Sequence, residues 1–150
     1  MTYIIPIASL VFILDRLTKI LALKALSEGR EIRVLPGAFH LTLVLNKGAA
    51  FGLFSRMTPV LILFAVISIF CMIVYLGRKR VSDTFQAIGL AMILGGALGN
   101  LTDRIFYGYV IDFIDLRVWP VFNVADSFIT IGAAVLIINM LFGRRPSPKA

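Results

Sequence analysis

Four long apolar segments, separated by shorter polar stretches, dominate the pattern of the chain. They cover residues 4–26, 59–76, 85–101 and 125–142. A helix needs about 20 largely apolar residues to cross the hydrocarbon core of a bilayer, so each segment predicts a transmembrane helix. The first segment is interrupted by the charged residues Asp15, Arg16, Lys19 and Lys24, which need partners inside a helix bundle.

The stretch between the first two segments has a different pattern. Residues 31–45 partly alternate apolar and polar side chains around a Pro36-Gly37 turn signal, which predicts short strands. The predicted fold is an all-α polytopic membrane protein in which four transmembrane helices carry a small extracytoplasmic β-sheet. Residues 1–150 form a single domain in this prediction, and the tail at 144–150 is expected to be disordered.

Composition agrees with a membrane protein and limits its partners. The chain is 59% hydrophobic and 15% charged, with a mean hydropathy of +0.95, whereas about a quarter of a soluble domain is charged. Its net charge of +7 comes from basic residues scattered at segment ends. This distribution favours anionic lipid headgroups as partners and excludes nucleic acid. The first segment lacks a preceding basic stretch and a clean cleavage site, so we expect it to be a retained span.

Basic clusters that adjoin the second and fourth segments favour a cytoplasmic side for both termini. These clusters are Arg78, Lys79 and Arg80, and Arg144, Arg145 and Lys149. The loop after the first segment is also basic, so the bias is not one-sided. Because the clusters directly abut the spans, we give them more weight, which places residues 29–56 and the 112–126 loop together on the outer face.

Polar residues inside the apolar segments are candidates for structural or functional roles. Asp15 and Lys19 are spaced four positions apart, so they can form an ion pair on one helical face. Such a pair can be purely structural, or it can orient a neighbouring catalytic group. Arg16 is expected to snorkel or to face the outer loop. Gly95 and Gly99 form a small-xxx-small pattern, which predicts close helix packing.

The end of the third segment carries three polar residues at helical spacing. Asn100, Asp103 and Arg104 lie on one face if the helix continues. Asp103 can form a capping ion pair with the neighbouring arginine. Asn100 and Arg104 are candidates for binding a substrate carbonyl, because both donate hydrogen bonds.

Two aspartates flank the last loop. Asp112 follows the third apolar segment and Asp126 opens the fourth, with Trp119-Pro120 between them. Proline interrupts a helix there, so the chain can turn back and bring the two carboxylates together. Asp126 can alternatively serve as a helix cap, although that role does not explain Asp112 or the nearby Asn123. Asp115 is the weaker rival to Asp112, because it lies further into the polar loop.

Two adjacent carboxylates can share one proton and activate a water molecule, which is the chemistry of aspartic proteases. Other hydrolytic centres fit less well. The lone His40 has no cysteine or second histidine nearby, so no metal or other cofactor is expected. Ser127 with Lys19 could form a Ser–Lys pair, but Lys19 already has Asp15 one turn away. A Ser–His–Asp set would depend on His40 alone.

Five stretches of the chain together carry a resemblance to a known family. They are Asp15-Arg16-Leu17-Thr18-Lys19, Asn46-Lys47-Gly48-Ala49-Ala50-Phe51-Gly52, Gly95-Gly96-Ala97-Leu98-Gly99-Asn100-Leu101-Thr102-Asp103-Arg104, Val110-Ile111-Asp112-Phe113 and Phe122-Asn123-Val124-Ala125-Asp126-Ser127. In this order they resemble the lipoprotein signal peptidase (signal peptidase II) family of bacterial inner membranes. Each stretch alone is weakly specific, but the five together are highly specific and span most of the chain.

The resemblance implies a four-helix membrane enzyme with a small extracytoplasmic β-cradle and its active site near the outer face. It implies that this enzyme, as a monomer, cleaves prolipoproteins just before the diacylglyceryl-modified cysteine and binds peptide-like inhibitors such as globomycin. It implies that Asp112 and Asp126 are catalytic. Positions matching substrate-binding or supporting residues are Asn46, Gly48, Asn100, Arg104 and Asn123, and positions matching structural residues are Asp15, Lys19 and Asp103. The short 112–126 connection is a departure that puts lid contacts in doubt.

Two other functions are compatible with parts of the pattern. A small four-helix proton-coupled exporter would use Asp15 and Asp126 to bind cations and protons, but it needs charges deep in the bundle and little outer structure. A non-catalytic assembly subunit would tolerate replacement of either aspartate by asparagine. The acids of this chain instead gather at one predicted face, beside a strand-forming loop, which favours the peptidase.

Overall fold

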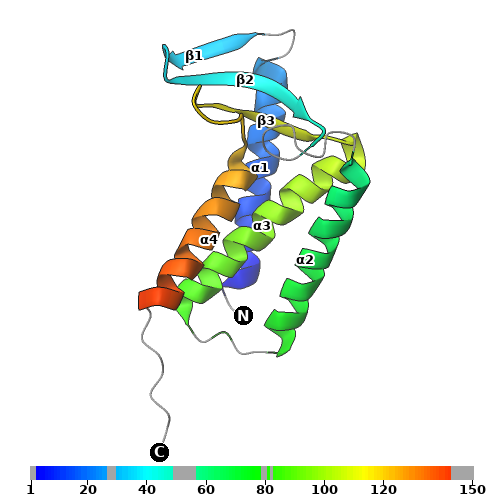
Figure 1. The fold of residues 1–150 in the computed structure, drawn as a ribbon, viewed down its shortest axis with the longest axis vertical. Coiled ribbons are helices and arrows are strands. Elements are labelled where there is room, and N and C mark those ends of the chain that lie inside the picture. The colour runs from blue at the N-terminus through cyan, green and yellow to red at the C-terminus, as the bar shows by residue number, and fades with distance from the viewer. Residues whose placement is uncertain (1–2, 27–29, 49–56, 79–80, 82, 143–150) are drawn as a thin grey trace, which may run out of the picture.

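The computed structural model describes residues 3–26, 30–48, 57–78, 81 and 83–142, and Figure 1 shows how they fold. The helices are α1 (Ile4–Ala25), α2 (Thr58–Arg78), α3 (Thr84–Tyr107) and α4 (Val124–Phe142). The strands are β1 (Glu31–Leu35), β2 (Phe39–Asn46) and β3 (Val110–Asp115). The sheet lies across one end of the helices, and α1 begins and α4 ends at the opposite end (Figure 1).

Three helices, α2, α3 and α4, are long and apolar enough to cross a membrane within the part of the chain that the structure describes. The helix α1 has 22 residues and packs against α3 and α4, but its four charged residues distinguish it from the other three. The tail expected to be disordered lies outside the described residues, as do the last four residues of the Asn46–Gly52 stretch.

The third helix is longer than the apolar pattern predicts, because it continues past Leu101 to Tyr107. It stops at Gly108, which has the left-handed backbone conformation (φ +76°) and whose N–H donates to the Arg104 carbonyl at 3.1 Å. Glycine is the residue that adopts this conformation at least cost at a helix end. The added turns place the polar residues of this helix end on regular helical spacing beneath the sheet.

The sheet is antiparallel with strand order β1-β2-β3. The predicted strands between 31 and 45 are confirmed, with the turn at Gly37 (φ +78°). The third strand was not predicted. In β3, Asp112 lies opposite Val44 and Asp115 lies opposite His40, so the two acids occupy different parts of the sheet.

Close packing of small residues holds α3 against α1, as the glycine pattern predicts. A Cβ atom on Gly95 would lie 2.5 Å from the Ala8 carbonyl oxygen, and one on Gly99 would lie 2.4 Å from a carboxylate oxygen of Asp15. Away from the sheet, the same helices bury an apolar cluster that includes Ile4, Ala8 and Ala91. At the sheet end, a second apolar cluster of Ala22, Leu26 and Phe113 lies beside a group of buried polar and charged residues.

Candidate active site

The two aspartates singled out in the sequence face one cavity of about 260 Å³ beneath the sheet. Its lining includes six of the predicted site residues: Asn46, Gly48, Asn100, Arg104, Asp112 and Asp126. They come from β2, β3, α3 and α4 and the residues just after β2. The fold therefore gathers residues that are scattered along the chain into one hollow.

Asn123 is hydrogen-bonded to both aspartates and so connects them. Its side-chain NH₂ donates to Asp112 at 2.7 Å. Its side-chain oxygen accepts the Asp126 backbone N–H at 2.9 Å, and the Asp126 carboxylate accepts the Asn123 backbone N–H at 3.3 Å. Asn123 is fully buried, so this bridge is held in one geometry.

The reciprocal bonds between Asn123 and Asp126 form a capping box at the start of α4. Because α4 begins at Val124, Asn123 occupies the cap position and Asp126 is the third helical residue. The capping alternative for Asp126 is thus present in the structure, and it coexists with the position of this carboxylate in the cavity wall. One oxygen serves the cap, while the other accepts the Asn100 side-chain NH₂ at 2.7 Å.

Asp112 is 2% exposed and accepts hydrogen bonds only from amides among its described contacts. The second donor is Asn46, whose NH₂ lies 2.9 Å from Asp112 and whose oxygen accepts the Gly48 N–H at 2.9 Å. Burial raises the pKa of Asp112 to about 6, although the Asn46 hydrogen bond opposes that shift, and the negative charge of Asp126 adds to it. The carboxyl group is therefore poised to hold a proton near neutral pH.

Arg104 lies one helical turn beyond Asn100 and lines the same cavity. Its guanidinium attracts Asp126 and Asp112 electrostatically. The cavity thus combines two carboxylates with one cation and several amide donors, which can hold both a water molecule and a peptide carbonyl.

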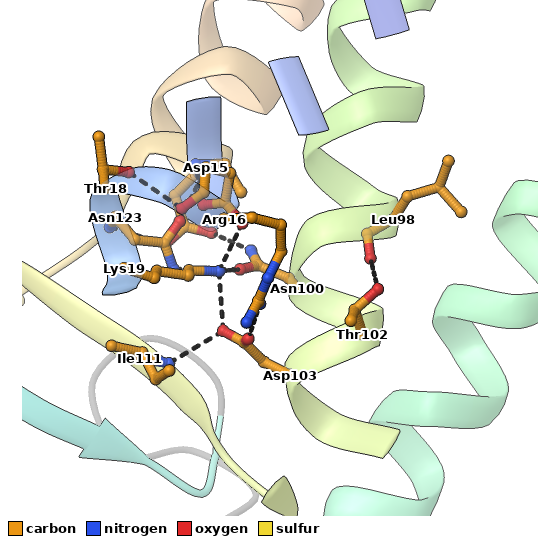
Figure 2. A network of polar contacts seen from close by, with 12 residues as sticks. Asp15, Arg16, Thr18, Lys19, Leu98, Asn100, Thr102, Asp103, Ile111 and Asn123 are labelled. Carbon is orange, nitrogen blue, oxygen red and sulfur yellow. Dashed lines mark hydrogen bonds and ion pairs between the residues drawn. The ribbon is translucent and has the colours of Figure 1, made fainter. Parts of the chain in front are cut away.

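A second group of charges lies beside the cavity, between α1 and α3 (Figure 2). Lys19 is fully buried, and its ammonium lies 2.9 Å from Asp15 and 2.8 Å from Asp103. Arg16 also bonds Asp103. The Asp15–Lys19 pair is confirmed. Arg16, which was expected to snorkel or to face the outer loop, bonds the buried carboxylate of Asp103 on α3.

These charges also anchor the elements that carry the cavity. Asp15 accepts the Ala125 backbone N–H at the start of α4 at 3.0 Å. Asp103 accepts the Ile111 backbone N–H of β3 at 3.2 Å. The prediction that Asp103 pairs with its neighbour Arg104 was wrong. Asp103 pairs with Arg16 and Lys19 of α1, whereas Arg104 lines the cavity.

The alternative candidates Asp115, Ser127 and His40 do not line this cavity. Asp115 accepts bonds from Thr42 at 3.3 Å and from Arg117, whose backbone N–H lies at 2.8 Å and holds the pKa of this carboxyl below its usual value. Ser127 donates to the Asn123 carbonyl, and Lys19 is held by its own partners, so no Ser–Lys pair forms. His40 contacts Glu31. Among the described residues, no group of His, Cys, Asp or Glu could hold a metal ion.

Six residues of the cavity wall were not among the predicted site residues: Val110, Trp119, Pro120, Val121, Phe122 and Thr130. Thr130 follows Asp126 by one helical turn, a spacing that could have identified it. Trp119 comes from the loop between β3 and α4, where no periodic pattern places a side chain.

Comparisons with known proteins give a consistent family assignment. Residues 7–142 match the family described as signal peptidase (SPase) II. A lipoprotein signal peptidase of Halothermothrix orenii is 41% identical over 93% of this chain and 94% of its own length, and one of Caldanaerobacter subterraneus subsp. tengcongensis is 45% identical over 92% and 95%. A solved bacterial membrane enzyme superposes with a TM-score of 0.89 and 29% identity, covering 100% of this chain and 95% of its own. The chain belongs to the signal peptidase II family.

Proposed function

We propose that this protein is an aspartic endopeptidase that removes the signal peptide from prolipoproteins by cleaving just before the diacylglyceryl-modified cysteine. The observation that carries the proposal is the shared cavity of Asp112 and Asp126, joined through Asn123. The names of the relatives support the substrate class. The exporter alternative is not supported, because one of its two acids, Asp15, is buried against Lys19 and the other, Asp126, lies in the wall of the cavity.

In the proposed reaction, Asp126 is the charged partner and Asp112 carries the shared proton, in line with its raised pKa of about 6. The charged carboxylate takes a proton from water as the water oxygen attacks the scissile carbonyl carbon. The neutral carboxyl gives its proton to the carbonyl oxygen. The tetrahedral intermediate then collapses: the C–N bond breaks, Asp126 gives the proton that it took from water to the leaving amine, and a hydroxyl of the intermediate returns a proton to Asp112.

We further propose that α1 is a fourth span and that residues 1–150 form one membrane domain. Three of its four charged residues, Asp15, Arg16 and Lys19, are neutralised inside the bundle by Asp103 and by one another, which lowers the cost of placing them in a membrane. The sheet then faces the extracytoplasmic side of the bacterial inner membrane, with both termini cytoplasmic. The protein acts as a monomer in this proposal, and globomycin-like peptides bind in the cavity.

An apolar groove adjoins the cavity and suits the lipid part of such a substrate. It has a volume of about 360 Å³, shares Asp126 with the cavity, and is walled by Leu116, Phe122 and Ile131 among others. A cleavage site at the membrane edge would place a peptide bond against the carboxylates while its apolar neighbours remain in the groove or in lipid. The net energy of this transfer is small, because acyl chains leave lipid to enter the groove.

The test compares three aspartate-to-asparagine variants of the full chain. Asp112→Asn and Asp126→Asn should each lower cleavage of a lipidated precursor by at least about 10³-fold, because each removes a proton-transfer group. Asp115→Asn is the matched control, since Asp115 also lies in β3 but bonds Thr42 and Arg117. It should keep most of the activity.

Products are resolved on a gel, and membrane insertion and melting temperature are measured for every variant. Turnover by either Asp112→Asn or Asp126→Asn near the level of the unmodified protein would overturn the proposed mechanism. An equal loss of cleavage activity in Asp115→Asn would mean that the loss comes from disturbing the sheet rather than from the carboxyl groups in the cavity.

A further inference from the structure

Lys19 is a buried cation whose hydrogen bond points toward the cavity rather than into the ion cluster. Its ammonium lies at ion-pair distance from Asp15 and Asp103, and it donates a hydrogen bond to the Asn100 side-chain oxygen at 2.9 Å. Figure 2 shows this ammonium between α1 and α3, with Asp15, Asn100 and Asp103 around it. Lys19 therefore connects the buried carboxylates of Asp15 and Asp103 to Asn100, which hydrogen-bonds Asp126.

The amide of Asn100 can serve Asp126 in only one of its two orientations. Its oxygen accepts from Lys19 at 2.9 Å and from the Asn123 NH₂ at 3.0 Å, and its own NH₂ donates to Asp126 at 2.7 Å. A flipped amide would place two N–H donors against an ammonium and would turn an oxygen lone pair toward a carboxylate. The ammonium of Lys19 and the Asn123 NH₂ thus both favour the orientation that gives Asp126 a donor, and Lys19 adds a positive charge to this preference.

The same cation takes part in the charge balance around the pair. The charged groups that interact here come from four elements. They are Asp15, Arg16 and Lys19 on α1, Asp103 and Arg104 on α3, Asp112 on β3 and Asp126 on α4. The Arg16 guanidinium also lies over the ring of Tyr107. This set contains three cations and four carboxyl groups. The group is electrically neutral when the Asp112–Asp126 pair holds one proton, which is the state that the proposed reaction requires.

We infer that Lys19 is a positioning residue for the Asp112–Asp126 pair, which orients Asn100 toward Asp126 and supplies the charge that keeps the pair singly protonated. This inference rests on the proposed function. It assigns Lys19 two separable effects, a donor effect through Asn100 and a charge effect on both carboxyl groups.

Two substitutions separate these effects. Lys19→Gln removes the charge but keeps an N–H donor of similar reach, whereas Lys19→Met removes both. Turnover at the optimal pH should fall about 100-fold for Lys19→Met and about 10-fold for Lys19→Gln, in the range of a lost positioned donor. Both should move the pH–rate profile upward by about one pH unit, because protons bind more tightly when a nearby cation is lost.

Because either substitution removes the cation that pairs with buried Asp15, each is also made together with Asp15→Asn. The double variants restore the charge balance, so their pH profiles should return to the original position, while the difference in turnover between Met and Gln persists. Asp15→Asn alone should move the profile downward. All rates are taken per folded molecule, with melting temperatures measured in parallel.

An unshifted pH profile in both single variants, or equal turnover of the Met and Gln variants, would overturn the inference. A purely structural Lys19 would lower the melting temperature without moving the profile. The proposed function fails separately: it fails if Asp126→Asn stays active, whereas the inference about Lys19 fails if Asp126→Asn is inactive and Lys19→Met keeps the original profile.

Discussion

Two pairs of aspartates lie side by side at the sheet end of the helices, and their surroundings differ. Asp15 and Asp103 are fully buried and contact the cations Lys19 and Arg16. Asp112 and Asp126 line a cavity and accept hydrogen bonds from amides. The first pair is neutralised by fixed charges, whereas the second pair receives donors that carry no charge.

This difference separates the aspartates that we expect to stabilise the fold from those that we propose to take part in the reaction. A carboxylate beside a fixed cation is strongly held in its charged form, and removing either partner leaves an uncompensated buried charge. A carboxyl group that is bonded by amides can change its protonation state without leaving a charged partner behind. We therefore expect substitutions in the first pair to affect mainly stability, and substitutions in the second pair to affect mainly turnover.

The largest stability effect is expected for Asp103→Asn. This substitution should lower the free energy of unfolding by about 3–5 kcal/mol, because it leaves Arg16 and Lys19 with one charged partner fewer. Asp15→Asn should act in the same direction, and it should lower stability more than it lowers turnover per folded molecule. Thermal melting in detergent, with cleavage assayed on the folded fraction, measures both. Unchanged melting with lost activity would contradict the separation of the two pairs.

A smaller loss of stability is expected where α3 packs against α1. Gly95→Ala should lower stability by about 1–3 kcal/mol, because the new methyl group would meet the Ala8 backbone at 2.5 Å. Gly77→Ala is the matched control, since no atom lies within 4 Å of its added methyl group. The control should leave stability unchanged or raise it by up to about 1 kcal/mol through helix propensity. Equal melting of the two variants would mean that this contact does not hold the charged cluster together.

The protonation of the cavity pair should show in the pH dependence of cleavage. Because burial raises the pKa of Asp112 to about 6, its proton is lost as the pH rises through that value, and the alkaline side of the activity profile falls with it. The same shift gives Asp112 a contribution to folding stability that is fully present below the usual aspartate pKa near 4 and is lost as the pH rises through about 6.

Asn46→Ala should move the alkaline limb of this profile upward by up to about one pH unit, because its hydrogen bond favours the charged form of Asp112. Thr42→Val is a control on the same strand, since Thr42 bonds Asp115 instead. The control profile should stay in place. A downward shift for Asn46→Ala would show that the amide favours the neutral carboxyl.

The smallest effect is expected from chelators. Treatment with EDTA should leave cleavage within the error of the assay, because the described residues hold no group of potential metal ligands and the proposed reaction uses carboxylates alone. The assay compares treated protein with treated protein resupplied with zinc. Loss of activity that zinc restores would redirect attention to a metal site outside the aspartate pair.

Much of the fold followed from local patterns. The four helices and the first two strands were predicted from apolar segments and alternation, and their observed bounds differ mainly at the end of α3. The strand β3 was missed because two acids interrupt its short apolar pattern, and aspartate is disfavoured in strands. Asp112 is tolerated there because Asn46 and Asn123 supply hydrogen bonds from other elements.

Partners of the charged residues were harder to predict than the helices that carry them. Asp103 was expected to pair with its neighbour, yet it bonds Arg16, which lies 87 positions away in the chain. Local spacing identified the Asp15–Lys19 pair because both residues lie on one helix face. It could not identify contacts between helices, since these depend on how closely the glycines of α3 let α1 approach.

The sequence by itself determined the membrane-protein class, the elements and the residue types available for chemistry, because hydrophobic patterning and turn signals act over a few residues. Only the tertiary structure decided which carboxylates meet cations and which meet amides. The contact between Asp15 and the start of α4 joins residues 110 positions apart. Such contacts form only when the packed bundle excludes water and every buried charge or donor takes its partner from a neighbouring element.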